Sequence, residues 1–284
     1  MSHHLQSRTT HPDMDFDTQY IDEIIRHAGQ TILLPAFQQH TYGLMQHKTD
    51  GSMVTDVDHK SQETIRRHLE RLTPSFAFIG EEMEDQRQQS LIDQRAQPCW
   101  VLDPLDGTSN FIAGMPCFAI SLGLIAGEEA VAGWVYDPIA DEMFAALPND
   151  PHLYCNNRTI TPQQSITSID ESIGFIDFKR LEHNIAISFI TTSPYHSCRN
   201  LGSCALEWAW LASGRAQFII HGGESLWDFA AGVALANRSG ATISSFTGTY
   251  PLQRDTLVSS ILAASNQQIH SRLNHHIQTI CHFK

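Results

Sequence analysis

The chain has 284 residues and a formal net charge of −13, with 31 acidic side chains against 18 lysines and arginines. Sequence-independent binding of nucleic acid needs a clustered basic surface, so this balance argues against that class of function. Anionic substrates stay possible, because carboxylates can bind divalent cations that then invert the local potential. The length allows one large domain or two packed halves.

The cysteines give no sign of a disulfide framework or a zinc ribbon, because none of the six forms a C-x-x-C pair. We expect reduced, mostly buried thiols. The first residues lack the positive and apolar regions of a secretory signal. No later stretch approaches the roughly 18 uninterrupted apolar residues of a membrane span. We therefore expect no membrane segment and a cytoplasmic location.

The first half of the sequence has the pattern of helices packed on an antiparallel sheet. Apolar residues recur at helical spacing over residues 16–37 and 58–72. Short β-like runs then follow, separated by Gly, Pro or acidic turns. These runs cover residues 76–79, 100–102, 118–125, 131–136 and 143–146.

A polar segment at residues 148–164, rich in Pro and Asn, is the best candidate boundary. Strand-like and helix-like runs alternate after it, which predicts an α/β layer. The expected strands lie near residues 172–178, 199–201, 216–220 and 260–264, and the expected helices at 181–190, 204–213 and 227–239. We predict one half over residues 1–150 and another over 151–284.

The densest chemical signal is the run W-V-L-D-P-L-D-G-T-S-N-F, an apolar strand that ends in Asp103 and Asp106. Pro104 keeps the residue before it extended and ends the strand. The second aspartate lies about one turn further on, so both carboxylates could share a divalent cation, with the Leu105 carbonyl as another oxygen ligand. The same run is also ordinary Asx-turn chemistry, so by itself it does not decide between the two.

Other short elements add anion-binding and acidic groups. Gly107 and Thr108 follow the two aspartates, where free backbone amides could hold an anion. Glu81 follows a short apolar strand and a glycine, while Asp228 and Asp58 each stand near the start of a helix. Taken singly, the last two also fit helix capping.

Taken together and in this order, G-E-E, D-P-L-D-G-T-S-N-F and W-D-F-A-A-G resemble the motifs of the inositol monophosphatase family. G-S-C-A-L, A-S-G-R and N-R-T-I look like further segments of that family, so the resemblance spans nearly the whole chain. It implies an α/β (α+β) fold, the layered αβαβα sandwich of fructose-1,6-bisphosphatase and inositol monophosphatase. Residues 1–150 would carry most metal ligands, and residues 151–284 would carry Asp228 and the substrate loops.

The resemblance also implies the roles of the acidic residues. Two or three Mg²⁺ ions would be held by Glu81, Asp103, the Leu105 carbonyl, Asp106 and Asp228. Such an oxygen-only set suits magnesium. Thr108, hydrogen-bonded to Asp58, would position the attacking water, and Glu81 would help to take its proton. The amides of Gly107 and Thr108 would hold the phosphate.

Substrate contacts are expected from Ser203, Cys204, His221 and Glu224. In inositol-specific members an acidic residue stands seven places before the W-D aspartate, but here that place holds His221, with Glu224 three residues later. The histidine could bind a second anionic group or cap the loop. Residues 110–116 look more like the inositol monophosphatase branch than the nucleotidase branch, which favours simple monoesters.

The leading prediction is therefore a magnesium-dependent phosphomonoesterase that hydrolyses a small phosphorylated metabolite. The alternatives within the same superfamily are a 3',5'-bisphosphate nucleotidase and a histidinol-phosphate phosphatase. A non-catalytic interaction protein is disfavoured, because every acidic position of the pattern is intact. A homodimer and inhibition by lithium are implied by the resemblance alone.

Overall fold

The computed structural model describes residues 14–40, 45–47, 53–93, 97–162, 166–252 and 257–281. Within these residues the strands form a seven-stranded sheet, a five-stranded sheet and one separate pair. The larger sheet runs in the order β3 (Ala77–Gly80), β4 (Cys99–Asp106), β5 (Ala119–Ala126), β6 (Glu129–Asp137), β7 (Glu142–Ala146), β8 (Leu153–Cys155) and β9 (Arg158–Ile160).

The smaller sheet runs in the order β11 (Ser197–Arg199), β10 (Ile173–Asp177), β12 (Phe218–Ser225), β14 (Val258–Ala264) and β13 (Thr242–Ser244). The separate pair is β1 (Met45–His47) and β2 (Met53–Thr55). The helices before the second sheet are α1 (Thr18–Ala28), η1 (Gly29–Leu33), α2 (Leu34–Gln39), α3 (Asp56–Leu72), α4 (Asp85–Asp93) and α5 (Thr108–Ile112). Those after the first sheet are η2 (Ile169–Glu171), α6 (His183–Thr192), α7 (Cys204–Ala212), α8 (Leu226–Ser239) and α9 (Gln267–Cys281).

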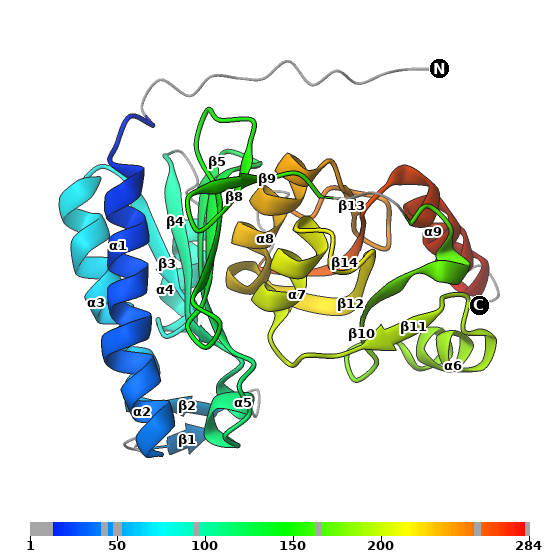
Figure 1. Cartoon of the computed structure of the whole chain (residues 1–284), viewed down its shortest axis with the longest axis horizontal. Helices are drawn as coiled ribbons and strands as arrows, with labels where there is room; N and C mark the ends of the chain where they lie inside the picture. Colours follow the sequence, from blue (N-terminus) through cyan, green and yellow to red (C-terminus); the bar gives the residue numbers. More distant parts are fainter. Residues whose placement is uncertain are drawn as a thin grey trace.

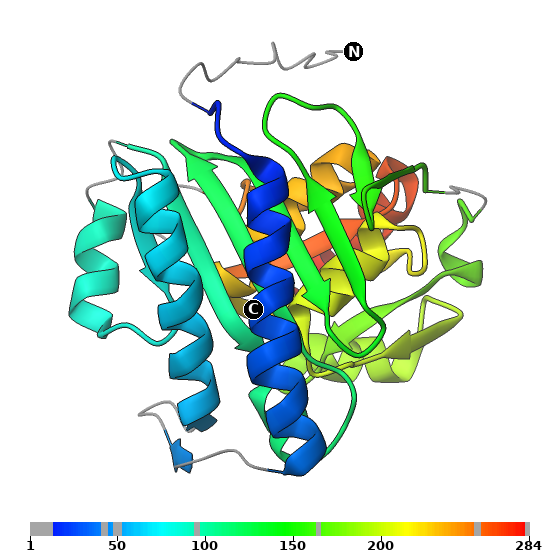
Figure 2. The ribbon, with the colours of Figure 1, turned by 60° about the vertical axis from the view of Figure 1, so that its left-hand side comes forward.

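The elements stack in five layers, which Figure 1 shows from left to right. Helices α1 and α3 cover the outer face of the larger sheet, as Figure 2 also shows. Helices α7 and α8 lie between the two sheets, and α6 and α9 cover the far side of the smaller sheet. The buried apolar side chains form three clusters: one on each outer side, and one around α7 and α8 that reaches both sheets. The predicted αβαβα sandwich is confirmed.

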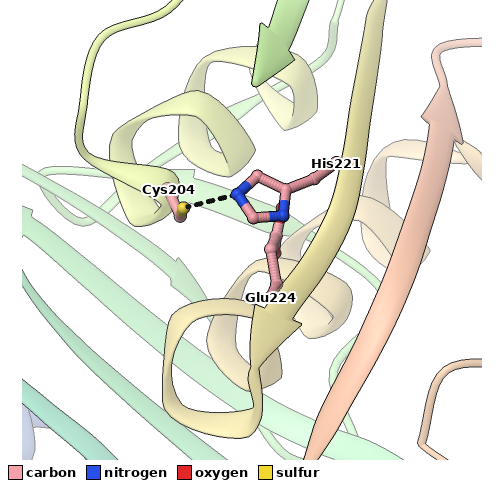
Figure 3. A group of neighbouring side chains, drawn as sticks. All are labelled: Cys204, His221 and Glu224. Atoms are coloured by element: carbon pink, nitrogen blue, oxygen red, sulfur yellow. Dashed lines mark hydrogen bonds between the residues drawn. The ribbon is translucent and has the colours of Figure 1, made fainter. Parts of the chain in front are cut away.

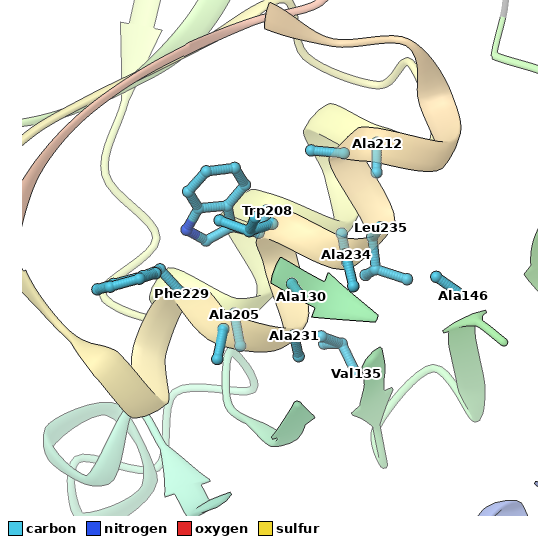
Figure 4. Packing of buried hydrophobic residues seen from close by; sticks show 14 of the residues in the cluster. Ala130, Val135, Ala146, Ala205, Trp208, Ala212, Phe229, Ala231, Ala234 and Leu235 are labelled. Atoms are coloured by element: carbon cyan, nitrogen blue, oxygen red, sulfur yellow. The ribbon is translucent and has the colours of Figure 1, made fainter. Parts of the chain in front are cut away.

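The middle layer is packed tightly because small residues face each other across it. An added Cβ on Gly123 of β5 would lie 2.8 Å from the Ala230 Cβ, and one on Gly133 of β6 would lie 2.5 Å from the Ala231 carbonyl oxygen. Figure 4 shows the alanines of α7 and α8 among the larger buried side chains of this core. The W-D-F-A-A-G segment therefore lies close against the sheet, which fixes the start of α8 beside the strand ends.

Several elements differ from the sequence-based expectation. The helix expected over residues 16–37 is formed by α1, η1 and α2, and its middle turn is a π-helix. Helices α4 and α5 were not predicted. The polar segment at 148–164 contains β8 and β9, which extend the larger sheet, so the chain leaves that sheet only after Ile160. Among the described residues, no helix is both long and apolar enough to cross a membrane.

Candidate metal centre

Strands β3 and β4 run parallel, so their carboxyl ends meet at one edge of the larger sheet. The Glu81 backbone N–H donates to the Leu102 carbonyl oxygen over 3.0 Å, which places Glu81 beside the strand that ends in the two aspartates. The regular pairing of β4 with β5 is interrupted between Asp103 and Asp106. The kink allows both aspartates to serve one site at the strand end.

Helix α8 brings a third aspartate to this edge. The Ser225 backbone N–H donates to Asp228 Oδ2 over 3.2 Å, which orients the carboxylate at the first turn of the helix. One carboxylate oxygen from each of Asp103, Asp106 and Asp228 lies within 4.8 Å of the other two. Three of the predicted ligand side chains therefore converge from two distant parts of the sequence.

The site is electrostatically unfavourable without a cation. Burial raises the pKa of Asp103 well above its usual range, and the neighbouring carboxylates of Glu81, Asp106 and Asp228 raise it further. Burial likewise raises the pKa of Asp228, and Asp106 and Glu81 add to the shift. Burial also raises the pKa of Asp106 to about 6, although hydrogen bonds from Ser203 and Ala205 oppose the shift. Mutually repelling buried carboxylates are stabilised by a divalent cation between them.

The donor set fits magnesium. Asp103, Asp106 and Asp228 offer only carboxylate oxygens, which are the hard ligands that Mg²⁺ prefers. The start of α7 holds Asp106 in place: the Ala205 backbone N–H donates to its Oδ2 over 2.9 Å, and the Ser203 hydroxyl donates to the same oxygen. Ser203 is buried, so its hydroxyl serves to orient Asp106 in this structure. Its predicted substrate contact stays a prediction.

Thr108 and Asp58 contact each other just after the end of β4. The Thr108 hydroxyl lies 3.1 Å from Asp58 Oδ1 and 3.1 Å from the Leu105 carbonyl oxygen. Asp58 is fully buried, and its other oxygen accepts from the backbone N–H and the hydroxyl of Thr55 at 2.9 and 2.6 Å. These bonds form a capping box at the start of α3 and fix the carboxylate that faces Thr108.

Gly107 is required by the backbone at this point. Its φ is +92°, and an added Cβ would lie 2.9 Å from the Cys117 carbonyl oxygen. It directly precedes α5, so the amides of Gly107 and Thr108 stand at a helix start, where intrahelical acceptors are missing. Asn110 ties this turn to its surroundings by donating to the carbonyl oxygens of Cys117 and Leu201, each over 2.7 Å.

The other predicted substrate residues, Cys204, His221 and Glu224, form a cluster of their own (Figure 3). His221 is 2% exposed and Glu224 is 0% exposed, whereas Cys204 is partly exposed. The Gly223 backbone N–H donates to His221 Nδ1 over 3.2 Å, so that nitrogen carries a lone pair and the ring proton lies on Nε2. Asp177 Oδ2 lies 3.2 Å from Nε2. Both ring nitrogens are thus engaged within the protein.

Two buried glutamines hold the Glu81 loop and were not identified from sequence. Gln88 of α4, 3% exposed, donates to the carbonyl oxygens of Gly80 and Glu81 over 2.8 and 3.1 Å. Gln62 of α3 accepts from the Glu82 backbone N–H over 3.0 Å. Nothing in a lone glutamine marks such a role, because it depends on where α3 and α4 meet the strand end.

Comparison with known proteins identifies a family for this chain. The model of the inositol monophosphatase family matches residues 14–282. Inositol monophosphatase 1 of Solanum lycopersicum is 31% identical over 72% of this chain and 76% of its own length. Nus factor SuhB of Xylella fastidiosa is 28% identical over 78% of this chain and 79% of its own length.

A solved structure has the same fold. The crystal structure of inositol monophosphatase II from Staphylococcus aureus has a TM-score of 0.77 at 25% identity, covering 93% of this chain and 96% of that one. The family match covers most of the chain, and it coincides with an acidic cluster at the strand ends of the same layered fold. The chain therefore belongs to the inositol monophosphatase family, whose members are phosphoric monoester hydrolases.

Proposed function

We propose that this protein is a magnesium-dependent phosphomonoesterase that hydrolyses a small phosphate ester by direct attack of water. The observation that carries the proposal is the convergence of Asp103, Asp106 and Asp228 within 4.8 Å. Bound Mg²⁺ at this site would activate the water and neutralise charge on the leaving oxygen. Hydrolysis of a monoester in solution is slow because it lacks both effects. Glu81 and the Leu105 carbonyl complete the proposed ligand set for two or three ions.

The chain's own residues would orient the water. The Thr108 hydroxyl donates to Asp58 and keeps its lone pairs free to accept a hydrogen bond from water. The capping box holds Asp58 still, so the acceptor position is fixed before substrate binds. Glu81 would take the proton of that water, and the amides of Gly107 and Thr108 would hold the phosphate oxygens.

The leaving-group side supports a monoester rather than a bisphosphate. Both ring nitrogens of His221 already have partners in the metal-free protein, the Gly223 N–H and the Asp177 carboxylate, which disfavours a contact with a second phosphate. The buried carboxyl groups of Glu224 and Glu207 lie near Cys204, another predicted substrate residue, and help to raise the pKa of its thiol, which burial raises most. A second phosphate would meet acidic groups there, which disfavours the 3',5'-bisphosphate nucleotidase alternative. Acidic groups are compatible with polyol or amine-bearing leaving groups, so the histidinol-phosphate alternative stays open.

The test is phosphate release from a substrate panel, each with magnesium and with chelator. The panel comprises inositol 1-phosphate, glycerol 2-phosphate, histidinol phosphate, fructose 1,6-bisphosphate and adenosine 3',5'-bisphosphate. We expect magnesium-dependent release, with monoesters ahead of both bisphosphates. A preference for adenosine 3',5'-bisphosphate would refute the monoester assignment, and no release from any member would contradict the proposed activity.

Further properties of the proposal come from the family. We propose that the protein forms a homodimer and that lithium inhibits it. Sedimentation tests the first property, and a lithium titration of the active protein tests the second. One relative is named Nus factor SuhB, so a second role beside catalysis is a candidate as well. That role does not require loss of the acidic ligands, all of which are present here.

A further inference from the structure

Cys204, His221 and Glu224 form a second group of donor atoms (Figure 3). It adjoins the carboxylate cluster, because the Cys204 backbone N–H donates to Asp106 Oδ1 over 3.3 Å. One ligand atom from each lies within 4.8 Å of the other two. Cys204 begins α7, while the other two lie on β12 on either side of a break in its pairing with β14. Residues three apart on a regular strand face opposite ways, so this irregularity is what lets both point to one place.

The distance between the Cys204 sulfur and the His221 nitrogen is close to the distance between two such atoms that bind the same metal ion. Cys204 Sγ lies 3.9 Å from His221 Nε2. In a tetrahedral zinc site, bonds of about 2.3 Å to sulfur and 2.05 Å to nitrogen separate those two atoms by about 3.6 Å. A thiol hydrogen-bonded to an imidazole gives a similar distance, so this observation does not decide between the two.

The unpaired oxygen of Glu224 favours a cation over a simple thiol–imidazole contact. Its Oε2 accepts from the Trp208 indole N–H over 2.8 Å. Its Oε1 is buried, and no donor within the described ranges reaches it. Glu224 is 0% exposed, so bulk solvent does not reach this oxygen. A buried, unpaired carboxylate oxygen is costly, and a cation beside it removes that cost.

We propose that Cys204, His221 and Glu224 bind one soft divalent cation of the zinc class, separate from the magnesium site. Sulfur and imidazole ligands select zinc over magnesium, whereas the neighbouring carboxylates have the opposite preference. Binding releases the thiol proton to solvent and moves the ring proton of His221 from Nε2 to Nδ1. That move gives up the bond from Gly223, and Asp177 then faces the cation in place of the ring proton.

The test uses Co²⁺ as a spectroscopic probe on the full, metal-free, reduced protein. A thiolate bound to Co²⁺ gives a charge-transfer absorption that carboxylates do not give. We expect this band to saturate at one equivalent and to survive a large excess of Mg²⁺. Cys204→Ser should abolish it, and Cys155→Ser, a change at a cysteine on β8, should leave it intact.

Glu224→Gln provides a second measurement that keeps the sulfur ligand. It should preserve the band but weaken the affinity for Co²⁺ at least tenfold. If Cys204→Ser does not fold, this variant alone tests whether the cation binds at the cluster. The proposal is overturned by the absence of a thiolate band, by its persistence in Cys204→Ser, or by its displacement by Mg²⁺. Phosphate release is not the readout, so failure here is distinct from failure of the proposed function.

Discussion

Neutralising Asp103 should separate its role in metal binding from any role in packing. The Asp103→Asn change keeps the side-chain volume, and the amide oxygen can still accept from the Leu105 backbone N–H, now 3.0 Å from Oδ1. Losing one charged ligand of the cation should cost about 3 to 4 kcal/mol in the transition state, which is a fall of about 10²- to 10³-fold in kcat.

Stability should change in the opposite direction when metal is absent. Since the pKa of Asp103 is raised by burial and by neighbouring carboxylates, its charge destabilises the metal-free fold at neutral pH. Asp103→Asn should therefore raise Tm in chelator. Magnesium at a hundred times its Kd should stabilise the native protein by about 2.7 kcal/mol, or roughly 5 to 8 °C in Tm, and the variant by much less.

Thermal melts with chelator and with Mg²⁺, together with phosphate release, measure both effects. Asp170→Asn, an exposed carboxylate beside β10, is the matched control and should leave both unchanged. A variant at Asp103 with near-native turnover and native stabilisation by Mg²⁺ would refute the assignment of this residue as a ligand.

Three other changes test the surrounding groups. Thr108→Val should lower kcat about tenfold to a hundredfold with little effect on Mg²⁺ affinity, because it removes the hydroxyl that contacts Asp58. Thr108→Ser keeps the hydroxyl and should retain most activity. Equal losses in the two variants would contradict this role. Gln88→Leu should raise the Mg²⁺ concentration needed for half-maximal activity about tenfold, because two carbonyls of the Glu81 loop lose their donor. The same change at exposed Gln86 should have no such effect. An unchanged magnesium requirement in Gln88→Leu would argue that Gln88 does not position the Glu81 loop. The pKa of Asp106 is raised to about 6, so its protonated form stabilises the metal-free fold; this contribution is present below about pH 4 and is lost as pH rises through 6. The difference in Tm between the native protein and Asp106→Asn in chelator should therefore change over that range. A difference independent of pH would contradict the raised pKa.

The acidic site could be located from sequence because its parts lie at predictable places. Asp103 and Asp106 follow an apolar strand, and Asp228 starts a helix of alanines, so periodicity alone puts each at the end of an element. That the ends of β4 and α8 meet was implied only by the family resemblance. The structure supplies the reason, because Gly123 and Gly133 admit α8 against the sheet.

The groups that orient the ligands could not be predicted in the same way. Gln88 lies on α4, a helix with a weak apolar pattern, and its partners are backbone carbonyls that any sequence would offer. The motif predicts a substrate contact for Ser203 but gives no sign that its hydroxyl also contacts Asp106. Likewise, the partner of His221 Nε2 is Asp177, which is 44 residues away in the chain. Such contacts depend on tertiary structure rather than on local pattern.

The most direct test of the central claim is phosphate release from inositol 1-phosphate or glycerol 2-phosphate by the native protein, first in chelator and then after Mg²⁺ is restored. The account predicts no release in chelator, recovery on addition of Mg²⁺, and no recovery in Asp103→Asn at the same Mg²⁺ concentration. Release that continues in chelator, or that is equal in the native and variant proteins, would contradict a magnesium-dependent reaction at the carboxylate cluster.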